Sequence, residues 1–322
     1  MTKVNNQTLP PAICLMGPTA SGKTDIAVHL VKNMPVEIIS VDSVLIYKDM
    51  NIGSAKPDEA TLKIAPHRLI NFLDPSQSYS VAEFRRDALD AMQEITQQGK
   101  IPLLVGGTML YFRALFDGLS TLPEADNLVR EKLEAEAADI GWSAMHEKLK
   151  AVDPEAAAKI HPNDPQRIQR ALEVYEISGQ PLSLLQQKHK SENGSAYNFT
   201  KIIVNPRERK VLHQRIEQRF VNMLETGFIE EVRALYERGD LNVDMPSMRA
   251  VGYRQVWEFL DGQRDYQSMQ ERGIVVTRQL AKRQLTWLRN EDDATWLDSQ
   301  DLASQPEDIY QQALNLVSHI PT

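Results

Sequence analysis

The chain has 322 residues, 42% of them hydrophobic, and a formal net charge of −8 at pH 7. This length exceeds that of one ordinary domain, so we expect a core domain with a second lobe. The single cysteine, Cys14, excludes an internal disulfide framework and a multi-cysteine zinc site, and its apolar surroundings predict a buried side chain. No apolar run reaches about 18 residues and the N-terminus is polar, so we expect a cytoplasmic protein without a membrane span.

Short apolar runs alternate with helical patterns in the first third of the chain. Runs typical of buried strands occupy Ala12–Met16, Val36–Val41 and Ile101–Val105, with a weaker one at Arg68–Leu73. Helical patterns occupy 22–33, Ser80–Gln98 and the segment after Thr108. This alternation predicts an α/β fold in which a mostly parallel sheet is flanked by helices.

The middle of the chain has a different sequence pattern, because strand-like apolar runs are absent between about Leu119 and Ser195. Charged, alanine-rich helices are predicted there at Asn127–Ala138, Ala144–Ala151 and Pro165–Ser178, before a loop at Lys188–Tyr197. The sheet resumes at Thr200–Val204, and the elements expected after it are Arg207–Leu224, Arg272–Arg289 and a strand near Ala294–Leu297. We therefore predict a core formed by 1–118 and 199–322, and an all-helical insertion domain at 119–198.

The strand at Ala12–Met16 runs into a glycine-rich loop. The loop reads Gly17-Pro18-Thr19-Ala20-Ser21-Gly22-Lys23-Thr24, which fits the P-loop pattern G-x-x-x-x-G-K-[ST] between a strand and a helix. In such a loop, backbone N–H groups and the helix N-terminus surround phosphate oxygens. Lys23 adds a mobile cation and the Thr24 hydroxyl is placed to bind Mg²⁺, while Thr19 and Ser21 offer further hydroxyl donors. The motif predicts a bound phosphate chain without specifying the reaction.

Only one of the neighbouring strands ends in a carboxylate. P-loop proteins that transfer a γ-phosphoryl group commonly carry an Asp at such a strand end to organise Mg²⁺. Ile101–Val105 instead ends in Gly106-Gly107-Thr108, whereas Val36–Val41 is followed by Asp42. From the residues alone, Asp42 is equally consistent with a metal ligand, a general base and a helix N-cap.

Eight segments in order along the chain resemble the tRNA dimethylallyltransferase family, in its bacterial form. They are Ser40–Tyr47, Met50–Pro57, Gly106–Tyr111, Asn163–Arg167, Arg170–Glu173, Arg215–Arg219, Arg249–Arg254 and Thr277–Gln284. The resemblance extends from about Ala12 to Arg289. Ser54 and Met109 stand where the family most often has Thr and Gly, and neither difference removes a charged group.

The resemblance implies a function as well as a fold. It implies a P-loop NTPase-like core whose helical insertion grips the anticodon stem-loop of tRNA. Dimethylallyl would pass from its diphosphate to N6 of the adenine 3′ of the anticodon, so the P-loop would hold a prenyl diphosphate rather than ATP. The implied catalytic residues are Asp42 as the base that accepts a hydrogen bond from N6–H, Thr24 with Mg²⁺, and Lys23 and Arg219 as phosphate contacts.

The net negative charge counts against an RNA partner unless basic residues are segregated on one face. Arg278, Lys282 and Arg289 lie at i, i+4 and i+11 and share one helix face. Arg249 and Arg254 bracket Gly252-Tyr253, which would place cations beside a stacking ring. With the contacts that the resemblance adds, the predicted tRNA-binding residues are Asp42, Ser43, Val44, Leu45, Thr108, Arg130, Gln166, Arg167, Ile168, Gln169, Arg170, Arg249, Ala250, Val251, Gly252, Tyr253, Arg254, Arg278, Lys282, Arg283 and Arg289.

Three other functions remain open at this point. A nucleoside or small-molecule kinase would also use the P-loop and would consume ATP. An adenylate prenyltransferase would modify free AMP or ADP, a reaction that needs no helical insertion. A regulatory P-loop ATPase would bind nucleotide without synthetic chemistry. We expect a monomer, because nothing in the sequence requires a partner subunit.

Overall fold

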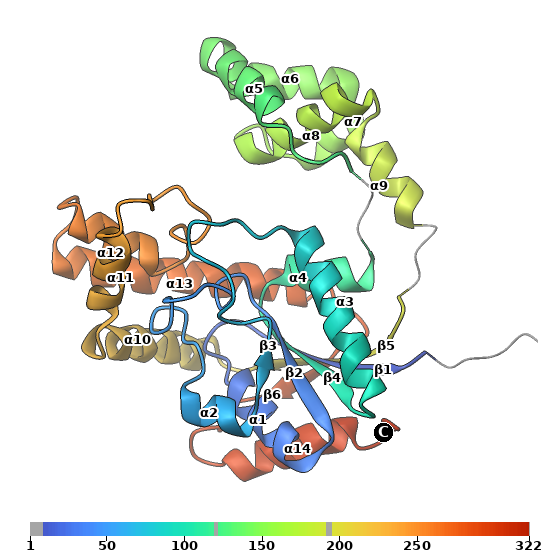
Figure 1. Cartoon of the computed structure of the whole chain (residues 1–322), viewed down its shortest axis with the longest axis vertical. Coiled ribbons are helices and arrows are strands. Elements are labelled where there is room, and N and C mark those ends of the chain that lie inside the picture. The colour runs from blue at the N-terminus through green and yellow to red at the C-terminus, as the bar shows by residue number, and fades with distance from the viewer. Residues whose placement is uncertain (1–8, 119–121, 191–194, 322) are drawn as a thin grey trace, which may run out of the picture. The chain divides into compact units, whose positions relative to one another are not determined.

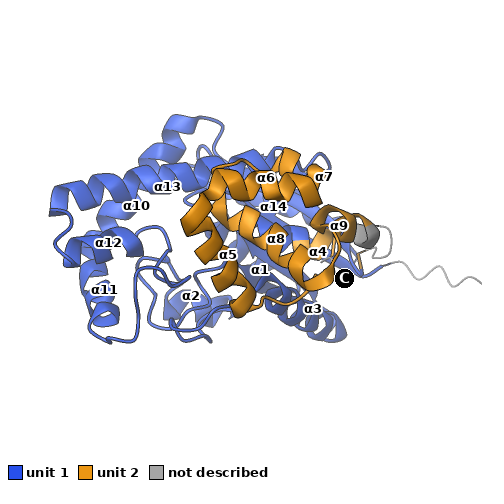
Figure 2. Ribbon diagram, turned by 90° about the horizontal axis from the view of Figure 1, so that it is seen from above, with its two compact units in different colours: residues 1–113, 196–322 blue, residues 114–195 orange. Residues whose placement is uncertain are grey.

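The computed structural model describes residues 9–118, 122–190 and 195–321, and it divides into two compact units. One unit comprises residues 1–113 and 196–322, and the other comprises residues 114–195 (Figure 2). The predicted domain boundaries, at 119 and 198, lie close to these. Within the described ranges, no helix is long and apolar enough to cross a bilayer.

The first unit is built on a six-stranded sheet in the order β3-β2-β4-β1-β5-β6 (Figure 1). Its strands are β1 (Pro11–Met16), β2 (Val36–Val41), β3 (His67–Arg68), β4 (Ile101–Gly106), β5 (Asn198–Asn205) and β6 (Thr295–Asp298). Every neighbouring pair is parallel, which confirms the predicted α/β fold. The central strands β1 and β4 are almost wholly buried, which explains their continuous apolar sequence.

The register of the sheet brings three loops together at its carboxyl edge. Met16 of β1 and Val41 of β2 both pair with Gly106 of β4. The segments that follow these strands are therefore the P-loop, the segment starting at Asp42 and the Gly107-Thr108 turn, and all three leave the sheet at the same edge. Ligands of open α/β sheets bind at this edge.

Helices cover the sheet and extend the first unit beyond it. They are α1 (Lys23–Asn33), α2 (Glu59–Ile64), α3 (Val81–Gln97), α10 (Arg209–Glu225), α11 (Phe228–Tyr236), α12 (Tyr253–Leu260), α13 (Tyr266–Leu288) and α14 (Pro306–Val317). Helix α4 (Met109–Phe116) crosses the boundary between the units. The apolar faces of α1 and α14 pack with Ile13, Leu15 and Leu103 of the sheet in one core cluster. A second cluster joins α10, α11, α12 and α13 around Phe228 and Tyr253.

The described part of the second unit consists of helices. They are α5 (Asn127–Ile140), α6 (Trp142–Val152), α7 (Pro154–Lys159), α8 (Pro165–Ser178) and α9 (Leu182–Lys190). Asp126, Asp153 and Asp164 each accept backbone N–H bonds at a helix start, which satisfies donors that the first turn leaves free. The core of this unit includes a carboxylate, Glu173, which is fully buried and accepts hydrogen bonds from Arg130, Arg170 and the Asp126 amide.

Some predicted elements differ from the observed ones. The strand expected at Arg68–Leu73 is confined to His67–Arg68, because Leu69 and Asn71 adopt left-handed backbone angles (φ 58° and 56°) that leave the ladder. The loop expected at Lys188–Tyr197 is wrong at its start, where α9 continues to Lys190, and its residues 191–194 lie outside the described residues. Cys14 is fully buried, as predicted, and burial raises the pKa of its thiol.

Candidate active site

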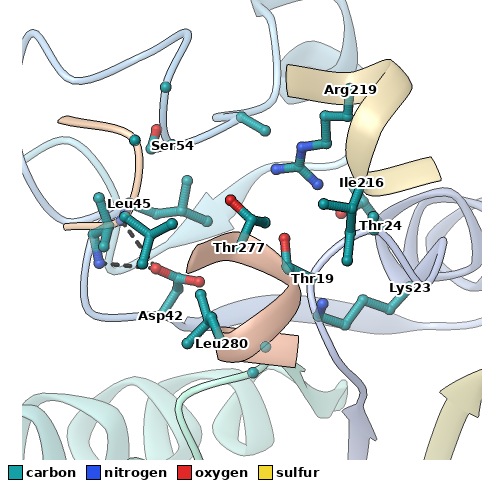
Figure 3. A pocket seen from close by; sticks show the side chains of 18 of the residues that line it. Thr19, Lys23, Thr24, Asp42, Leu45, Ser54, Ile216, Arg219, Thr277 and Leu280 are labelled. Atoms are coloured by element: carbon teal, nitrogen blue, oxygen red, sulfur yellow. Dashed lines mark hydrogen bonds between the residues drawn. The ribbon is translucent and has the colours of Figure 1, made fainter. Parts of the chain in front are cut away.

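A cavity opens at the carboxyl edge of the sheet, entirely within the first unit (Figure 3). Its floor comes from the segments after β1, β2 and β4, and its walls come from α10, α13 and the loop that includes Gly53 and Ser54. The lining combines P-loop residues and charged side chains with apolar side chains. Those that the argument uses are Thr19, Ala20, Lys23, Thr24, Ser40, Asp42, Leu45, Gly107, Ile216, Arg219, Phe220, Leu280 and Gln284.

The P-loop has the backbone shape that its glycines predict. Gly22 has φ 91°, in the left-handed region that disfavours other residues, and α1 starts directly after it. A Cβ on Gly17 would lie 2.5 Å from the Val204 carbonyl oxygen, so this position is closed to side chains. Ser21 is fully buried and its hydroxyl has no hydrogen-bond partner within the described residues. The Ser21 amide donates to the Pro18 carbonyl oxygen at 3.3 Å, and a role for the Ser21 hydroxyl as a phosphate donor stays a prediction.

Two cations share the cavity. Lys23 Nζ donates to the Pro18 carbonyl oxygen at 2.9 Å. Burial, followed by the positive charge of Arg219, lowers the pKa of Lys23 to about 8, and the negative charge of Asp42 opposes both effects. Burial also lowers the pKa of Arg219, again opposed by Asp42. Desolvated like charges disfavour each other, so an anion entering between Lys23 and Arg219 would relieve a stored repulsion.

Asp42 lies across the cavity from these cations, with its side chain held by the turn that follows it (Figure 3). Its Oδ1 accepts from the Val44 amide at 2.8 Å and from the Leu45 amide at 3.3 Å. This pattern caps a turn, since residues 43–46 do not form an α-helix. The capping uses one carboxylate oxygen and leaves Oδ2 for a ligand, so the capping interpretation is compatible with a further role.

The turn after β4 is tied to the segment that carries Asp42. The Thr108 amide donates to the Val41 carbonyl oxygen at 3.2 Å, and Thr108 Oγ1 accepts from the Ser43 amide at 3.1 Å. Gly106 lets these backbones approach, because a Cβ there would lie 2.0 Å from the Val41 oxygen. That Thr108 contacts tRNA stays a prediction.

Oxygen donors suited to Mg²⁺ line the cavity. The Thr24 hydroxyl is exposed there, and the buried Ser40 hydroxyl has no hydrogen-bond partner within the described residues. Mg²⁺ prefers a few protein oxygens completed by water and substrate phosphates, which this donor set fits. Across the described ranges, no group of three or more His, Cys, Asp or Glu side chains could hold a metal ion on its own.

Comparison with known families identifies the chain. A family model described as IPP transferase matches residues 45–291, and one described as isopentenyl transferase matches residues 11–74. The chain belongs to the IPP transferase family. It is a prenyltransferase enzyme, as the sequence had predicted.

Solved structures give the same result. A full-length tRNA isopentenylpyrophosphate transferase from Bacillus halodurans is 36% identical, with a TM-score of 0.66 over 96% of this chain and 99% of that one. The Staphylococcus epidermidis tRNA delta(2)-isopentenylpyrophosphate transferase is 32% identical, with a TM-score of 0.67 over 96% of this chain and 100% of that one. A eukaryotic dimethylallyltransferase acting on tRNA is 26% identical, with a TM-score of 0.82 over 97% of this chain and 80% of that one.

Helix α13 of this IPP transferase presents different residues to two cavities. Thr277, Leu280 and Gln284 line the cavity described above. Arg278, Lys282 and Arg289 line a second, basic cavity, where they join residues that the sequence had not singled out: Arg207, Arg209 and His213. Both sets could be recognised in the sequence by their helical spacing. The residues of the active-site cavity lie at i, i+3 and i+7 from Thr277, and the basic residues lie at i, i+4 and i+11 from Arg278. Arg283 is exposed and does not line either cavity.

The segment Arg249–Arg254 places only some of its predicted contacts at the surface. Arg249 and Arg254 are exposed, and Val251 lines the active-site cavity. Tyr253 is fully buried, its ring packs edge-on against Phe228 at 5.1 Å between centroids, and its hydroxyl donates to a glutamate. The prediction that Tyr253 offers a stacking ring is therefore wrong, because its ring packs in the aromatic core and its hydroxyl is bonded to Glu231 of α11.

Some of the predicted tRNA-binding residues in the second unit are also occupied by contacts within that unit. Gln166 and Arg167 are exposed at the start of α8, where backbone amides favour a phosphate. Ile168 is fully buried in the core of the unit, so its side chain is not an RNA contact. Arg130 and Arg170 pair with buried Glu173 at 2.9 Å and 2.7 Å, and both side chains stay partly exposed. Gln169 donates to a carboxylate on α5.

Proposed function

We propose that this enzyme transfers the dimethylallyl group of dimethylallyl diphosphate to N6 of the adenine 3′ of the anticodon in tRNA, releasing pyrophosphate. The observation that carries the proposal is one cavity with Lys23 and Arg219 on one side and Asp42 on the other. Among the residues that the structure describes, only one carboxylate oxygen of Asp42, Oδ1, accepts backbone hydrogen bonds. The similarity to tRNA isopentenylpyrophosphate transferases and to a dimethylallyltransferase acting on tRNA supports both substrates.

The P-loop side accommodates the leaving group. As the bond between the allylic carbon and the diphosphate oxygen breaks, negative charge grows on the diphosphate. Loop amides, Lys23 and Arg219 stabilise that charge, and they are already in place before the reaction. Mg²⁺ held by the Thr24 and Ser40 hydroxyls would supply further neutralisation of the diphosphate.

The Asp42 side accommodates the nucleophile. The N6 lone pair of adenine is delocalised into the ring, so N6 attacks more readily when a carboxylate accepts a hydrogen bond from N6–H. Oδ2 of Asp42 is the free oxygen, and it takes the N6 proton as the carbon–nitrogen bond forms. Apolar side chains of α10 and α13, including Ile216, Phe220 and Leu280, surround the five-carbon group and exclude water from the allylic cation.

The acceptor must come from a flexible part of an RNA. An adenine inside a duplex hides N6 in its stack, and extruding it costs a few kcal/mol, least in a loop. Arg278, Lys282 and Arg289 gather on one cavity of an otherwise acidic chain, which suits contacts to the phosphate backbone. Alanine substitutions there should weaken tRNA binding and flatten its salt dependence.

One experiment separates the proposal from its alternatives. The enzyme is mixed with labelled dimethylallyl diphosphate, ATP, AMP and unmodified tRNA, and all products, labelled or not, are identified. Prenylated adenine within tRNA supports the proposal. Prenylated AMP would make the enzyme an adenylate prenyltransferase, a phosphorylated product would make it a kinase, and ADP without any prenylated product would make it an ATPase.

The role of Asp42 is tested by Asp42→Asn. We expect turnover to fall by about 10³-fold while the dissociation constant for tRNA stays within about threefold. Asp49→Asn is the matched control, because Asp49 is exposed and its left-handed backbone (φ 60°) tolerates asparagine. A loss of tRNA affinity as large as the loss of turnover would show that Asp42 binds RNA rather than assisting the chemistry.

A further inference from the structure

One polar side chain on α13 contacts both loops that frame the active-site cavity. The Thr19 amide of the P-loop donates to Gln284 Oε1 at 3.0 Å. Gln284 Nε2 donates to the Gly107 carbonyl oxygen at 2.9 Å. The amide group of Gln284 thus bridges the diphosphate side of the cavity and the turn after β4, using its acceptor on one and its donor on the other.

The packing around this bridge leaves no spare room. A Cβ on Gly107 would lie 2.4 Å from Gln284 Nε2 and 3.0 Å from the Gly17 carbonyl oxygen. The turn after β4 and the P-loop are therefore in close contact, and the glutamine fits only because position 107 has no side chain. This contact accounts for the glycine at position 107, which a phosphate-binding role does not require.

The bridge continues toward the catalytic carboxylate. Gly107 is followed by Thr108, which holds the two residues that flank Asp42: its amide donates to Val41 at 3.2 Å and its hydroxyl accepts from Ser43 at 3.1 Å. A shift of the Gly107 peptide would thus be transmitted through two hydrogen bonds to the backbone on both sides of Asp42.

We infer that Gln284 is a positioning residue that sets the separation between the P-loop and the segment carrying Asp42. On the proposed function, on which this inference rests, that separation aligns the allylic carbon with adenine N6. Two substrates held by two different loops react only when the loops are in register, and a misplacement of about 1 Å costs roughly 100-fold in rate. Gln284 acts through these loops and supplies no proton or charge to the reaction.

The test compares Gln284→Ala with Gln267→Ala. Gln267 lies on the same helix, is exposed, and its side chain donates to Glu271, so its loss controls for the helix itself. We expect Gln284→Ala to lower kcat by about 30- to 100-fold, with the KM for dimethylallyl diphosphate and the Kd for tRNA within about threefold of the wild type. Unfolding curves of both variants verify that each is folded.

A second variant, Gln284→Glu, adds a signature that general destabilisation would not produce. Its carboxyl keeps an acceptor for the Thr19 amide but, when ionised, sets a second oxygen against the Gly107 carbonyl. When protonated, the carboxyl can donate to that carbonyl as the glutamine does. We therefore expect the ratio of its kcat to that of the wild type to rise as pH falls from about 8 to about 6, since facing a carbonyl raises the pKa of the new carboxyl.

The outcomes separate this inference from the proposed function. An active wild type whose kcat survives Gln284→Ala within about threefold overturns the inference alone. A loss confined to the KM for the donor or to the Kd for tRNA also overturns it, because Gln284 would then be a binding residue. A wild type that transfers no prenyl group overturns the proposed function and this inference with it.

Discussion

Donor binding should depend on pH through Lys23. Burial and the neighbouring Arg219 lower the pKa of Lys23 from 10.5 to about 8 in the free enzyme. A bound diphosphate favours the ammonium form and raises that pKa again, so binding above pH 8 must take up a proton. The dissociation constant then scales as 1 + 10^(pH − 8), which is about twofold weaker at pH 8 and about elevenfold weaker at pH 9 than at low pH. The phosphates of the donor ionise near pH 6, so they are already fully charged in this range.

Calorimetric titration of dimethylallyl diphosphate into the enzyme from pH 7 to pH 9.5, at constant Mg²⁺, measures this dependence directly. Repeating it in two buffers with different ionisation enthalpies counts the proton taken up, expected to be about one half per donor at pH 8. Lys23→Met lacks the ammonium and should bind more weakly but with an affinity independent of pH. An affinity of the wild type that stays constant across the range, or an equal fall in Lys23→Met, would refute the reasoning.

Two further predictions concern stability. Glu173→Gln should destabilise the second unit by about 2–3 kcal/mol in urea unfolding, because Arg130 and Arg170 lose a buried ionised partner; an unchanged midpoint would contradict this. The pKa of the Glu173 carboxyl is lowered in the folded chain. Its contribution to the free energy of unfolding is therefore present at neutral pH and lost as pH falls through this lowered pKa. Gly53→Ala should cost about 1–3 kcal/mol, because the added Cβ would lie 2.0 Å from a Phe228 ring carbon, and a thermal midpoint equal to that of the wild type would show that the loop relaxes freely.

The fold was predictable where local pattern and burial agree. Strands β1, β2 and β4 are short, mostly apolar runs that end at turn residues, and α8 carries both an aspartate cap and a terminal glycine, so their sequences are unambiguous. Helices α11 and α12 were not predicted, because each is short and follows a glycine that resembles a loop. The prediction of a strand at Arg68–Leu73 was wrong because two residues there adopt left-handed backbone angles. The pattern of apolar residues gives no sign of such angles.

The candidate site was predictable where the sheet itself assembles it. Parallel strands with aligned carboxyl ends bring the P-loop, Asp42 and Gly107 to one edge, so adjacency follows once the fold is known. Gln284 could not be found this way, because it reaches the P-loop across 265 residues of sequence. The burial of individual side chains could not be predicted from the sequence either. Tyr253 was expected at the RNA surface from its neighbours, but tertiary packing places it in the core.

Helix α13 has a consequence for how the enzyme can vary. Residues on one side of this helix line the active-site cavity, and residues on the other line the basic cavity. An α-helix advances about 100° per residue, so inserting or deleting one residue between Thr277 and Gln284 would turn all later side chains away from both cavities at once. Amino-acid exchanges at its exposed positions away from both cavities, such as Gln267, leave that arrangement intact. The length of this stretch is thus less free to change than its composition.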